Sequence, residues 1–331
     1  MPQLERMGWR ADMAAALAGL GDATLSARRV VSADRRGVRI GDGDAETSAV
    51  VPGRMRHRAR SRDLPVVGDW VAVRAPAPAE PPVVEAVLPR HGELARRDPD
   101  QRSEQVLAAN VDLALLVMGL DGDFNLRRLE RYVALVRAAA VAPVVVLSKA
   151  DLCSQVAQRV AEVEAAFPAV PVLALSLVAP GAERAVEPHL PPGDTAVLLG
   201  SSGAGKSTLL NTLFGQQVQR TGGVREHDSR GRHTTTTRQL FVLPGGALVI
   251  DTPGLRELEL LDASAGLADA FPELAELADS CRFRDCRHVD EPGCAVMQAA
   301  QEGRVEQDRV EAYRKISAEL ARAARAPRRR R

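Results

Sequence analysis

The apolar positions along the chain fall into three successive patterns. From residue 28 to about residue 90 they form short runs separated by Gly, Pro and Asp, as in a small sheet of short strands. From about residue 110 to 250, apolar strands alternate with amphipathic helices, which predicts a parallel sheet with helices on both faces. Beyond residue 260 the spacing is helical. We therefore expect a β domain, an α/β domain and a helical domain, in that order.

The individual elements follow from the same pattern. In the β domain we expect five strands, at residues 30–31, 37–40, 48–51, 69–73 and 83–87. In the α/β domain we expect strands at 113–118, 144–147, 170–175, 196–199 and 247–250, with helices at 126–140, 155–167 and 209–214.

The polar stretch 96–102 is the best candidate for the first domain boundary. We place the β domain at 28–100, the α/β domain at 101–260 and the helical domain at 261–331. Residues 1–27 then form a short helical extension, to which the sequence assigns no function.

Composition narrows the function classes. The chain has 331 residues, 45% of them hydrophobic, and no apolar run approaches the roughly 20 residues of a membrane span. Its acidic, arginine-containing start is not a secretory signal, so we expect a cytoplasmic protein with no membrane partner. Only 3% of residues are aromatic, which excludes base stacking as a major recognition device. The net charge of +1 hides two arginine-rich segments.

A phosphate-binding loop follows the apolar run 196–199. Its sequence fits GxxxxGK[ST], between an expected strand and an expected helix. Glycines let successive backbone N–H groups converge on a diphosphate, and the following helix adds its N-terminal partial charge. Lys206 is expected to reach the β- and γ-phosphates, and the Ser207 hydroxyl to hold Mg²⁺. The nucleotide contacts expected from this loop are Gly200, Ser201, Ser202, Gly203, Ala204, Gly205, Lys206, Ser207 and Thr208.

Two further motifs indicate a GTPase. Asp251-Thr-Pro-Gly254 is a DxxG motif at the end of an apolar strand, so its carboxylate can face the Mg²⁺ shell and the Gly254 N–H the γ-phosphate. The run Ser148, Lys149, Ala150, Asp151 resembles the guanine-reading [NT]KxD motif, in which the aspartate contacts the base. In ordinary GTPases that motif follows DxxG, whereas here it precedes it. The motif order therefore predicts a circularly permuted GTPase domain.

A polar, glycine-rich stretch separates the phosphate loop from DxxG and is typical of a nucleotide-dependent switch. One of Thr234, Thr235, Thr236 and Thr237 is expected to complete the Mg²⁺ coordination. Two roles stay open for His233: a catalytic one toward the attacking water or the γ-phosphate, and simple contact with phosphate or RNA. The catalytic role is considered because Leu255 stands where many GTPases carry a water-orienting Gln.

The helical domain contains a set of metal-ligand residue types: Cys281, Cys286, His288 and Cys294. Three thiols and one imidazole within fourteen positions match tetrahedral Zn²⁺ with no open coordination site, so we expect one structural zinc ion. The three cysteines of this set cannot all pair as disulfides, and a cytoplasmic chain argues against disulfides in any case.

The two arginine-rich segments are candidate RNA contacts. Alternate arginines in an extended backbone would project from one face about 6.6 Å apart, a spacing suited to phosphates. These arginines are Arg54, Arg56, Arg58, Arg60 and Arg62. The second segment is the basic C-terminal tail, residues 322–331. For both segments the alternative is a solvated stretch without a partner.

Together these motifs resemble the ribosome small-subunit-dependent GTPase A family (RsgA, also called YjeQ). The resemblance rests on the phosphate loop and on residues 105–112, 128–132, 231–236, 251–256 and 281–294. It implies an OB-fold for the β domain, and GTP or GDP and the small ribosomal subunit with its rRNA as partners of a monomer. Ser148 departs from the usual Asn or Thr, so its shorter hydroxyl would have to tie the guanine loop to the phosphate loop. The alternative function is an RNA-binding assembly factor that uses GTP or GDP as a conformational ligand.

Overall fold

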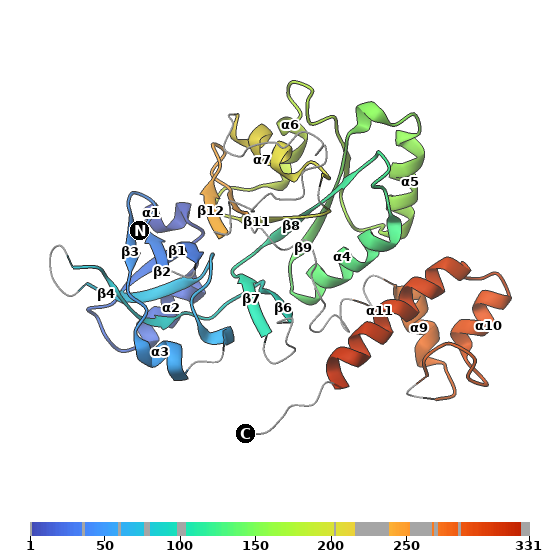
Figure 1. Ribbon diagram of the computed structural model, residues 1–331, viewed down its shortest axis with the longest axis horizontal. Helices are drawn as coiled ribbons and strands as arrows, with labels where there is room; N and C mark the ends of the chain where they lie inside the picture. Colours follow the sequence, from blue (N-terminus) through green and yellow to red (C-terminus); the bar gives the residue numbers. More distant parts are fainter. Residues whose placement is uncertain are drawn as a thin grey trace, which may run out of the picture.

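The computed structural model describes residues 2–34, 37–58, 61–75, 80–97, 104–201, 203–215, 238–251, 267, 271–283 and 286–325. Figure 1 shows the three regions, with the β domain mainly in blue, the α/β domain mainly in green and yellow, and the helical domain in orange and red. The extension before the barrel contributes helices α1 (Pro2–Arg6) and α2 (Ala11–Gly19). No helix of the described residues is long and apolar enough to cross a bilayer.

The β domain is a small closed barrel of five strands. They are β1 (Ser26–Asp34), β2 (Gly37–Gly41), β3 (Glu46–Ala49), β4 (Trp70–Arg74) and β5 (Val83–Val87). Strand β1 pairs with β2 and β4, β2 pairs with β3, and β4 pairs with β5. A parallel bridge from Val50 to Val83 joins the end of β3 to β5 and closes the ring. All five strands overlap the predicted positions, and the pairing order is that of an OB-fold.

In the described residues 53–58 and 61–63, the arginines of the barrel do not lie on the extended backbone that the sequence suggested. Residues 53–58 are helical (α3, Gly53–Arg58), and a 3₁₀ turn (η1) covers Ser61–Asp63. Alternate residues of a helix point about 200° apart, so the prediction of one shared arginine face is wrong for this segment. Arg54 forms an ion pair with Glu85, and Arg62 forms one with Glu93 at 2.8 Å. Arg60 lies outside the described residues.

The α/β domain has a parallel sheet in the order β10-β9-β8-β11-β13. Its strands are β8 (Leu113–Gly119), β9 (Ala142–Ser148), β10 (Val172–Ala174), β11 (Thr195–Leu199) and β13 (Leu248–Asp251). Its helices are α4 (Leu126–Ala138), α5 (Val156–Ala166), α6 (Glu183–Val186) and α7 (Lys206–Phe214), with 3₁₀ turns η2 (Ala150–Leu152) and η3 (Glu187–His189). The strong apolar runs therefore gave the predicted strands and helices.

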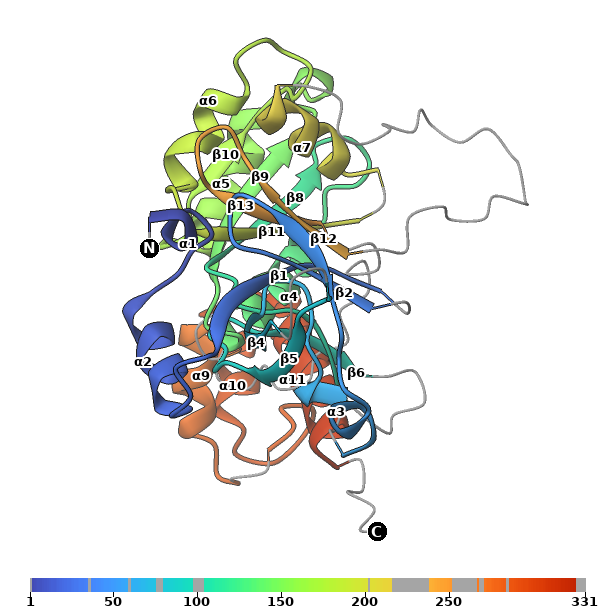
Figure 2. The same cartoon turned by 90° about the vertical axis from the view of Figure 1, so that its left-hand side faces the viewer.

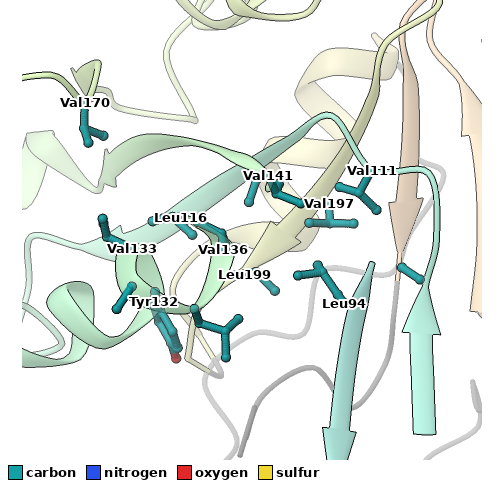
Figure 3. Packing of buried hydrophobic residues seen from close by; sticks show 14 of the residues in the cluster. Leu94, Val111, Leu116, Tyr132, Val133, Val136, Val141, Val170, Val197 and Leu199 are labelled. Atoms are coloured by element: carbon teal, nitrogen blue, oxygen red, sulfur yellow. The ribbon is translucent and has the colours of Figure 1, made fainter. Parts of the chain in front are cut away.

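Helices cover both faces of this sheet. Successive side chains of each strand point to opposite faces and so enter two separate cores. On β8, Leu116 faces the core that α4 and α5 complete, whereas Leu115 faces the core on the α7 side. Figure 3 shows Val133 and Val136 of α4 against this sheet. Burying each such apolar side chain contributes roughly 1.5–3 kcal/mol. This packing stabilises the helices on the sheet far more than their helix propensity does.

Two pairings escaped the sequence analysis. Strand β12 (Arg238–Val242) runs antiparallel to β13 and also to β1, through the pairs Ser32↔Gln239 and Ala33↔Arg238. The barrel and the α/β domain thus share one continuous sheet, as Figure 2 shows where β1 and β12 lie side by side. In addition, β6 (Leu94–Arg97) and β7 (Glu104–Ala108) form a hairpin around the polar stretch that suggested a domain boundary.

The C-terminal region contains α9 (Pro272–Asp279), α10 (Ala295–Gln301) and α11 (Gln307–Arg325). Apolar residues Phe271, Leu274, Val310 and Ile316 form part of its buried core. Helix α11 contacts α4 of the α/β domain. The helical character predicted for this region is therefore confirmed in its described part.

Candidate functional site

The phosphate-loop sequence lies at the C-terminal edge of the parallel sheet. Strand β11 ends at Leu199, and helix α7 begins at Lys206. A Cβ atom on Gly200 would stand 2.1 Å from the carbonyl oxygen of Val117, so only glycine fits at the start of the turn. Gly205 has a φ of 98°, a left-handed conformation that glycine adopts without strain. These two glycines let the chain turn sharply from strand to helix.

Lys206 lies across this loop. Its Nζ donates to the carbonyl oxygen of Gly200 at 2.8 Å and to that of Ser201 at 2.5 Å. Ser207 and Thr208 occupy the first turn of α7, where free backbone N–H groups attract anions. Ser202 lies outside the described residues. The loop thus gathers an ammonium group and a helix N-terminus at one point.

The guanine-type motif lies beside this loop. Ser148 is fully buried at the end of β9, and its hydroxyl donates to the carbonyl oxygen of Ala204 at 2.6 Å. That bond is the link that the sequence assigned to the serine. Lys149 has a φ of 59°, so its backbone is left-handed. Ala150 and Asp151 follow in η2, where Asp151 is exposed to solvent.

Two carboxylates of this edge, Asp121 and Asp123, were not predicted from the sequence. They lie in the loop between β8 and α4, at the same end of the sheet. Asp121 accepts from Lys149 Nζ at 2.6 Å, and Asp123 accepts from the Ser201 hydroxyl at 2.6 Å. No nucleotide motif covers these positions. The available signal was acidic residues directly after a fully buried strand.

The DxxG motif is described only at its first residue. Asp251 ends β13, and β13 is paired with β11, so this carboxylate lies at the same sheet edge as the phosphate loop. Gly254 lies outside the described residues, as do Leu255, His233 and Thr234 to Thr237. Their predicted roles stay predictions.

The predicted metal ligands converge in the C-terminal region. The ligand atoms of Cys281, Cys286, His288 and Cys294 all lie within 4.8 Å of one another. His288 Nδ1 is 3.6 Å from Cys281 Sγ and 3.5 Å from Cys294 Sγ, and these two sulfurs are 3.9 Å apart. Tetrahedral zinc bond lengths imply about 3.8 Å between two sulfurs and about 3.5 Å between sulfur and nitrogen. The donor set and its spacing therefore fit such an ion.

The surrounding backbone holds these ligands in place. Cys294 is the N-cap of α10, and its sulfur accepts from the Met297 N–H at 3.4 Å. The Glu291 carboxylate accepts from the backbone N–H groups of Arg287 and Val289, both at 2.9 Å. These bonds lower the pKa of Glu291 to about 2. The Glu291 carboxylate therefore stays ionised, and its two hydrogen bonds hold the turn that carries His288.

Comparison with known proteins identifies the family. The family model described as RsgA GTPase matches residues 87–261. The small ribosomal subunit biogenesis GTPase RsgA of Opitutus terrae is 46% identical over 97% of this chain and 91% of its own length. The chain belongs to the RsgA GTPase family. It is accordingly a GTP hydrolase.

Solved structures agree with this assignment. YjeQ from Thermotoga maritima superposes with a TM-score of 0.64 at 26% identity, covering 90% of this chain and 99% of that one. YloQ, described as a circularly permuted GTPase, gives 0.62 at 25% identity over 92% and 98%. The predicted fold, a circularly permuted α/β P-loop GTPase domain after an OB-fold barrel, is thereby confirmed. The family implies Mg²⁺ with the nucleotide, and the Cys₃His cluster could hold a metal ion.

Proposed function

We propose that this site of the RsgA GTPase family binds GTP·Mg²⁺ and GDP at the C-terminal edge of the parallel sheet, and that hydrolysis is coupled to late maturation of the small ribosomal subunit. The observation that carries the proposal is the bond from the Ser148 hydroxyl to Ala204, which joins the guanine-type loop to the phosphate loop. Ligands of open α/β sheets bind at this edge.

Each motif then has a role in holding the nucleotide. Lys206 leaves the loop carbonyls for the β- and γ-phosphates, and Ser207 and Asp251 serve the Mg²⁺ ion and its shell. Asp151 accepts hydrogen bonds from the guanine N1–H and amino groups, while the stem of Lys149 packs along the base. Gly254 donates its N–H to the γ-phosphate. His233 is the candidate for the group that acts on the attacking water.

The Cys₃His cluster is proposed to hold one structural zinc ion. Four protein ligands fill a tetrahedral shell and leave no position for substrate. The distances among Cys281, His288 and Cys294 support this assignment, as does the soft character of three thiolates.

The proposed macromolecular partner is the rRNA of the small subunit, bound by a cytoplasmic monomer. The OB-fold barrel and the basic tail are the candidate contacts. In the barrel, Arg54 and Arg62 are exposed but engaged with Glu85 and Glu93, so RNA phosphates would have to displace these carboxylates. Arg56, Arg58 and Arg60 complete the proposed RNA-binding set.

The decisive experiment is GTP turnover with and without purified small subunits. Because Leu255 replaces the water-orienting Gln, basal turnover should be slow. In related enzymes, a partner that supplies or orders a catalytic group accelerates hydrolysis by about 10³ to 10⁵. We expect strong stimulation that falls with added salt, and loss of all turnover in Lys206→Ala. Equal turnover with and without subunits at low salt and saturating GTP would favour the conformational-ligand alternative.

Guanine selectivity tests the same site from the base side. Adenine presents an acceptor at N1, where guanine presents a donor, so the Asp151 carboxylate should reject ATP. Asp151→Asn should erode the preference for GTP and favour xanthine nucleotides. Equal affinity of the wild-type chain for ATP and GTP would overturn the assignment of residues 148–151.

A further inference from the structure

The loop at residues 120–125 connects β8 to α4 and lies between the two nucleotide loops. On one side it contacts the guanine-type loop, because the Asp121 carboxylate accepts from Lys149 Nζ at 2.6 Å. On the other side it contacts the phosphate loop, because the Asp123 carboxylate accepts from the Ser201 hydroxyl at 2.6 Å. One short loop therefore contacts both halves of the site through two different carboxylates. We call it the bridging loop.

Asp121 is well placed to orient Lys149. The Asp121 carboxylate holds the ammonium group with one oxygen and accepts from the Asp123 N–H at 3.2 Å with the other. The ammonium group of Lys149 lowers the pKa of Asp121, so the carboxylate is ionised at neutral pH. Space is tight here, because a Cβ on Gly119 would lie 2.5 Å from Asp121 Oδ1 and 3.5 Å from Lys149 Cδ. The lysine stem thus lies next to Gly119 and Asp121.

Asp123 is well placed to fix the phosphate loop. One carboxylate oxygen accepts from Ser201 and also from the Gly119 N–H at 3.4 Å, while the other pairs with Arg128 of α4 at 2.7 Å. Arg128 also donates to the carbonyl oxygen of Asp123. This guanidinium balances the carboxylate charge, so Asp123 can stand near a phosphate site without repelling the anion.

The bridging loop is itself held at its C-terminal end. Asn125 caps α4, with its side-chain oxygen accepting from the Arg128 N–H at 3.0 Å. The Arg159 guanidinium of α5 lies 4.7 Å from the ring centroid of Phe124. Helix α5 follows the guanine-type loop, so Phe124 supplies a second link to that side. Because the loop is held in this way, its carboxylates can hold Lys149 and Ser201 in place.

We propose that Asp121 and Asp123 are positioning residues of the nucleotide site, Asp121 by orienting Lys149 toward the base and Asp123 by holding Ser201 and with it the phosphate loop. This inference rests on the proposed nucleotide site and adds residues outside its motifs. The contacts that place the two carboxylates are those with Lys149 and Ser201. Their effect on affinity is exerted through the residues that they hold, and the loop keeps the base half and the phosphate half of the site in register.

The test is a set of double-mutant cycles on the affinity of the full chain for fluorescently labelled GDP. Asp121→Ala and Asp123→Ala should each raise Kd about tenfold. Asp121→Ala should have little further effect in Lys149→Ala, and Asp123→Ala should have little further effect in Ser201→Ala. In the crossed pair, Asp121→Ala with Ser201→Ala, the increases in Kd of the two single variants should multiply more nearly than they do in the two direct pairs. This pairing distinguishes positioning from a general loss of stability, which would weaken all combinations alike.

Controls separate the two proposals. Glu164→Gln removes an exposed carboxylate of α5 and should bind GDP as the wild-type chain does. If the wild-type chain does not bind GDP, or Lys206→Ala binds equally well, the nucleotide site itself is wrong. If the wild-type chain binds and Lys206→Ala does not, but both aspartate variants match wild type, the positioning inference alone is overturned.

The amide variants keep the test valid if an alanine variant fails to fold. Asp121→Asn and Asp123→Asn retain an acceptor oxygen for Lys149 and for Ser201, and they change almost no volume. Each should recover part of the alanine defect, leaving Kd about threefold above wild type. An amide variant that folds and binds GDP as tightly as wild type would contradict the role of that carboxylate charge.

Discussion

The GTPase domain is joined to the barrel and to the C-terminal region by different kinds of contact. On the barrel side the junction is a backbone ladder, in which β12 pairs with β1 inside one continuous sheet. On the C-terminal side, prominent contacts are side-chain ion pairs between α11 and α4. Backbone ladders respond little to salt or pH, whereas ion pairs respond to both. The two junctions should therefore fail under different conditions.

The barrel junction also contains a buried charge, Arg29 of β1, which is 1% exposed. Its guanidinium donates to the carbonyl oxygens of Met7, Gly68 and Asn110 and, at 2.8 Å, to the hydroxyl of Thr195. Burial lowers the pKa of Arg29 to about 10, so it remains charged at neutral pH. One side chain thus connects the N-terminal extension, the barrel and the GTPase domain. This gives residues 1–27 a structural role that the sequence left unassigned.

The C-terminal junction centres on Arg309 of α11. This guanidinium donates to Glu130 of α4 at 2.9 Å and to Glu273 of α9. A second pair, from Arg127 of α4 to Asp308 of α11, measures 2.9 Å and is exposed to solvent. Glu130 is 2% exposed, and its Oε2 has no hydrogen-bond partner among the described residues. The junction therefore combines one buried and one screened contact.

The largest effect is expected from the metal cluster of the C-terminal region. Cys286→Ser removes one of four ligands, and structural zinc in small domains contributes about 10–16 kcal/mol of folding free energy. Elemental analysis should show loss of zinc, and hydrogen exchange should show loss of protection in α9 and α10. The β1–β12 ladder should keep its protection. Wild-type protein purified without chelator and free of zinc would contradict the metal assignment.

The next largest effect is expected at Arg29. Arg29→Met leaves buried carbonyl oxygens without their donor, which should lower the free energy of unfolding by about 3–5 kcal/mol. Urea unfolding measures this change. The matched control is Arg39→Met on β2, whose pair with Glu46 is exposed and should contribute less than about 0.5 kcal/mol. Equal losses in the two variants would show that the buried network does not hold the barrel junction.

The features that could be predicted from the sequence are those that depend on neighbouring residues. The barrel strands were predictable because short apolar runs between turn residues are local signals, and the metal cluster was predictable because its ligands lie close together in sequence. The guanine-type and phosphate loops were predictable from motifs. In each case the information lies within a few residues of the structure that it specifies.

The features that were missed depend on partners far away in sequence. Strand β12 follows a polar stretch, and of its residues only Leu240 is buried, so its pairing with β1 is set by tertiary structure. The arginine row had a strand-like period, but the backbone at Gly53–Arg58 is helical. Asp121 and Asp123 carry no motif, and their role appears only once Lys149 and Ser201 lie beside them.

A smaller effect is expected from the ionisation of Glu130. Burial raises the pKa of Glu130 to about 7, against the pull of Arg309 and Arg127 and with a further rise from Glu273. An acid whose pKa is raised by folding contributes stability at low pH that is lost as pH rises through the folded pKa. Wild type should therefore lose about 1 kcal/mol more than Glu130→Gln between about pH 6 and pH 8. Parallel pH profiles of urea unfolding for the two proteins would contradict this.

The smallest effect is expected at the exposed pair of the same junction. Arg127 contacts Asp308 at 2.9 Å and Glu311 at 3.4 Å, and the Asp308 side chain is 80% exposed. Arg127→Ala should lower the free energy of unfolding by less than about 1 kcal/mol at low salt. At 1 M salt the screening length falls to about 3 Å, so the difference from wild type should vanish. Arg309→Ala is the comparison, because it leaves the Glu130 carboxylate buried without its cation; its larger loss should persist at high salt. If the loss in Arg309→Ala also disappeared at 1 M salt, the contact between Arg309 and Glu130 would be screened by solvent as the exposed pair is. The distinction between a buried and a screened contact would then fail.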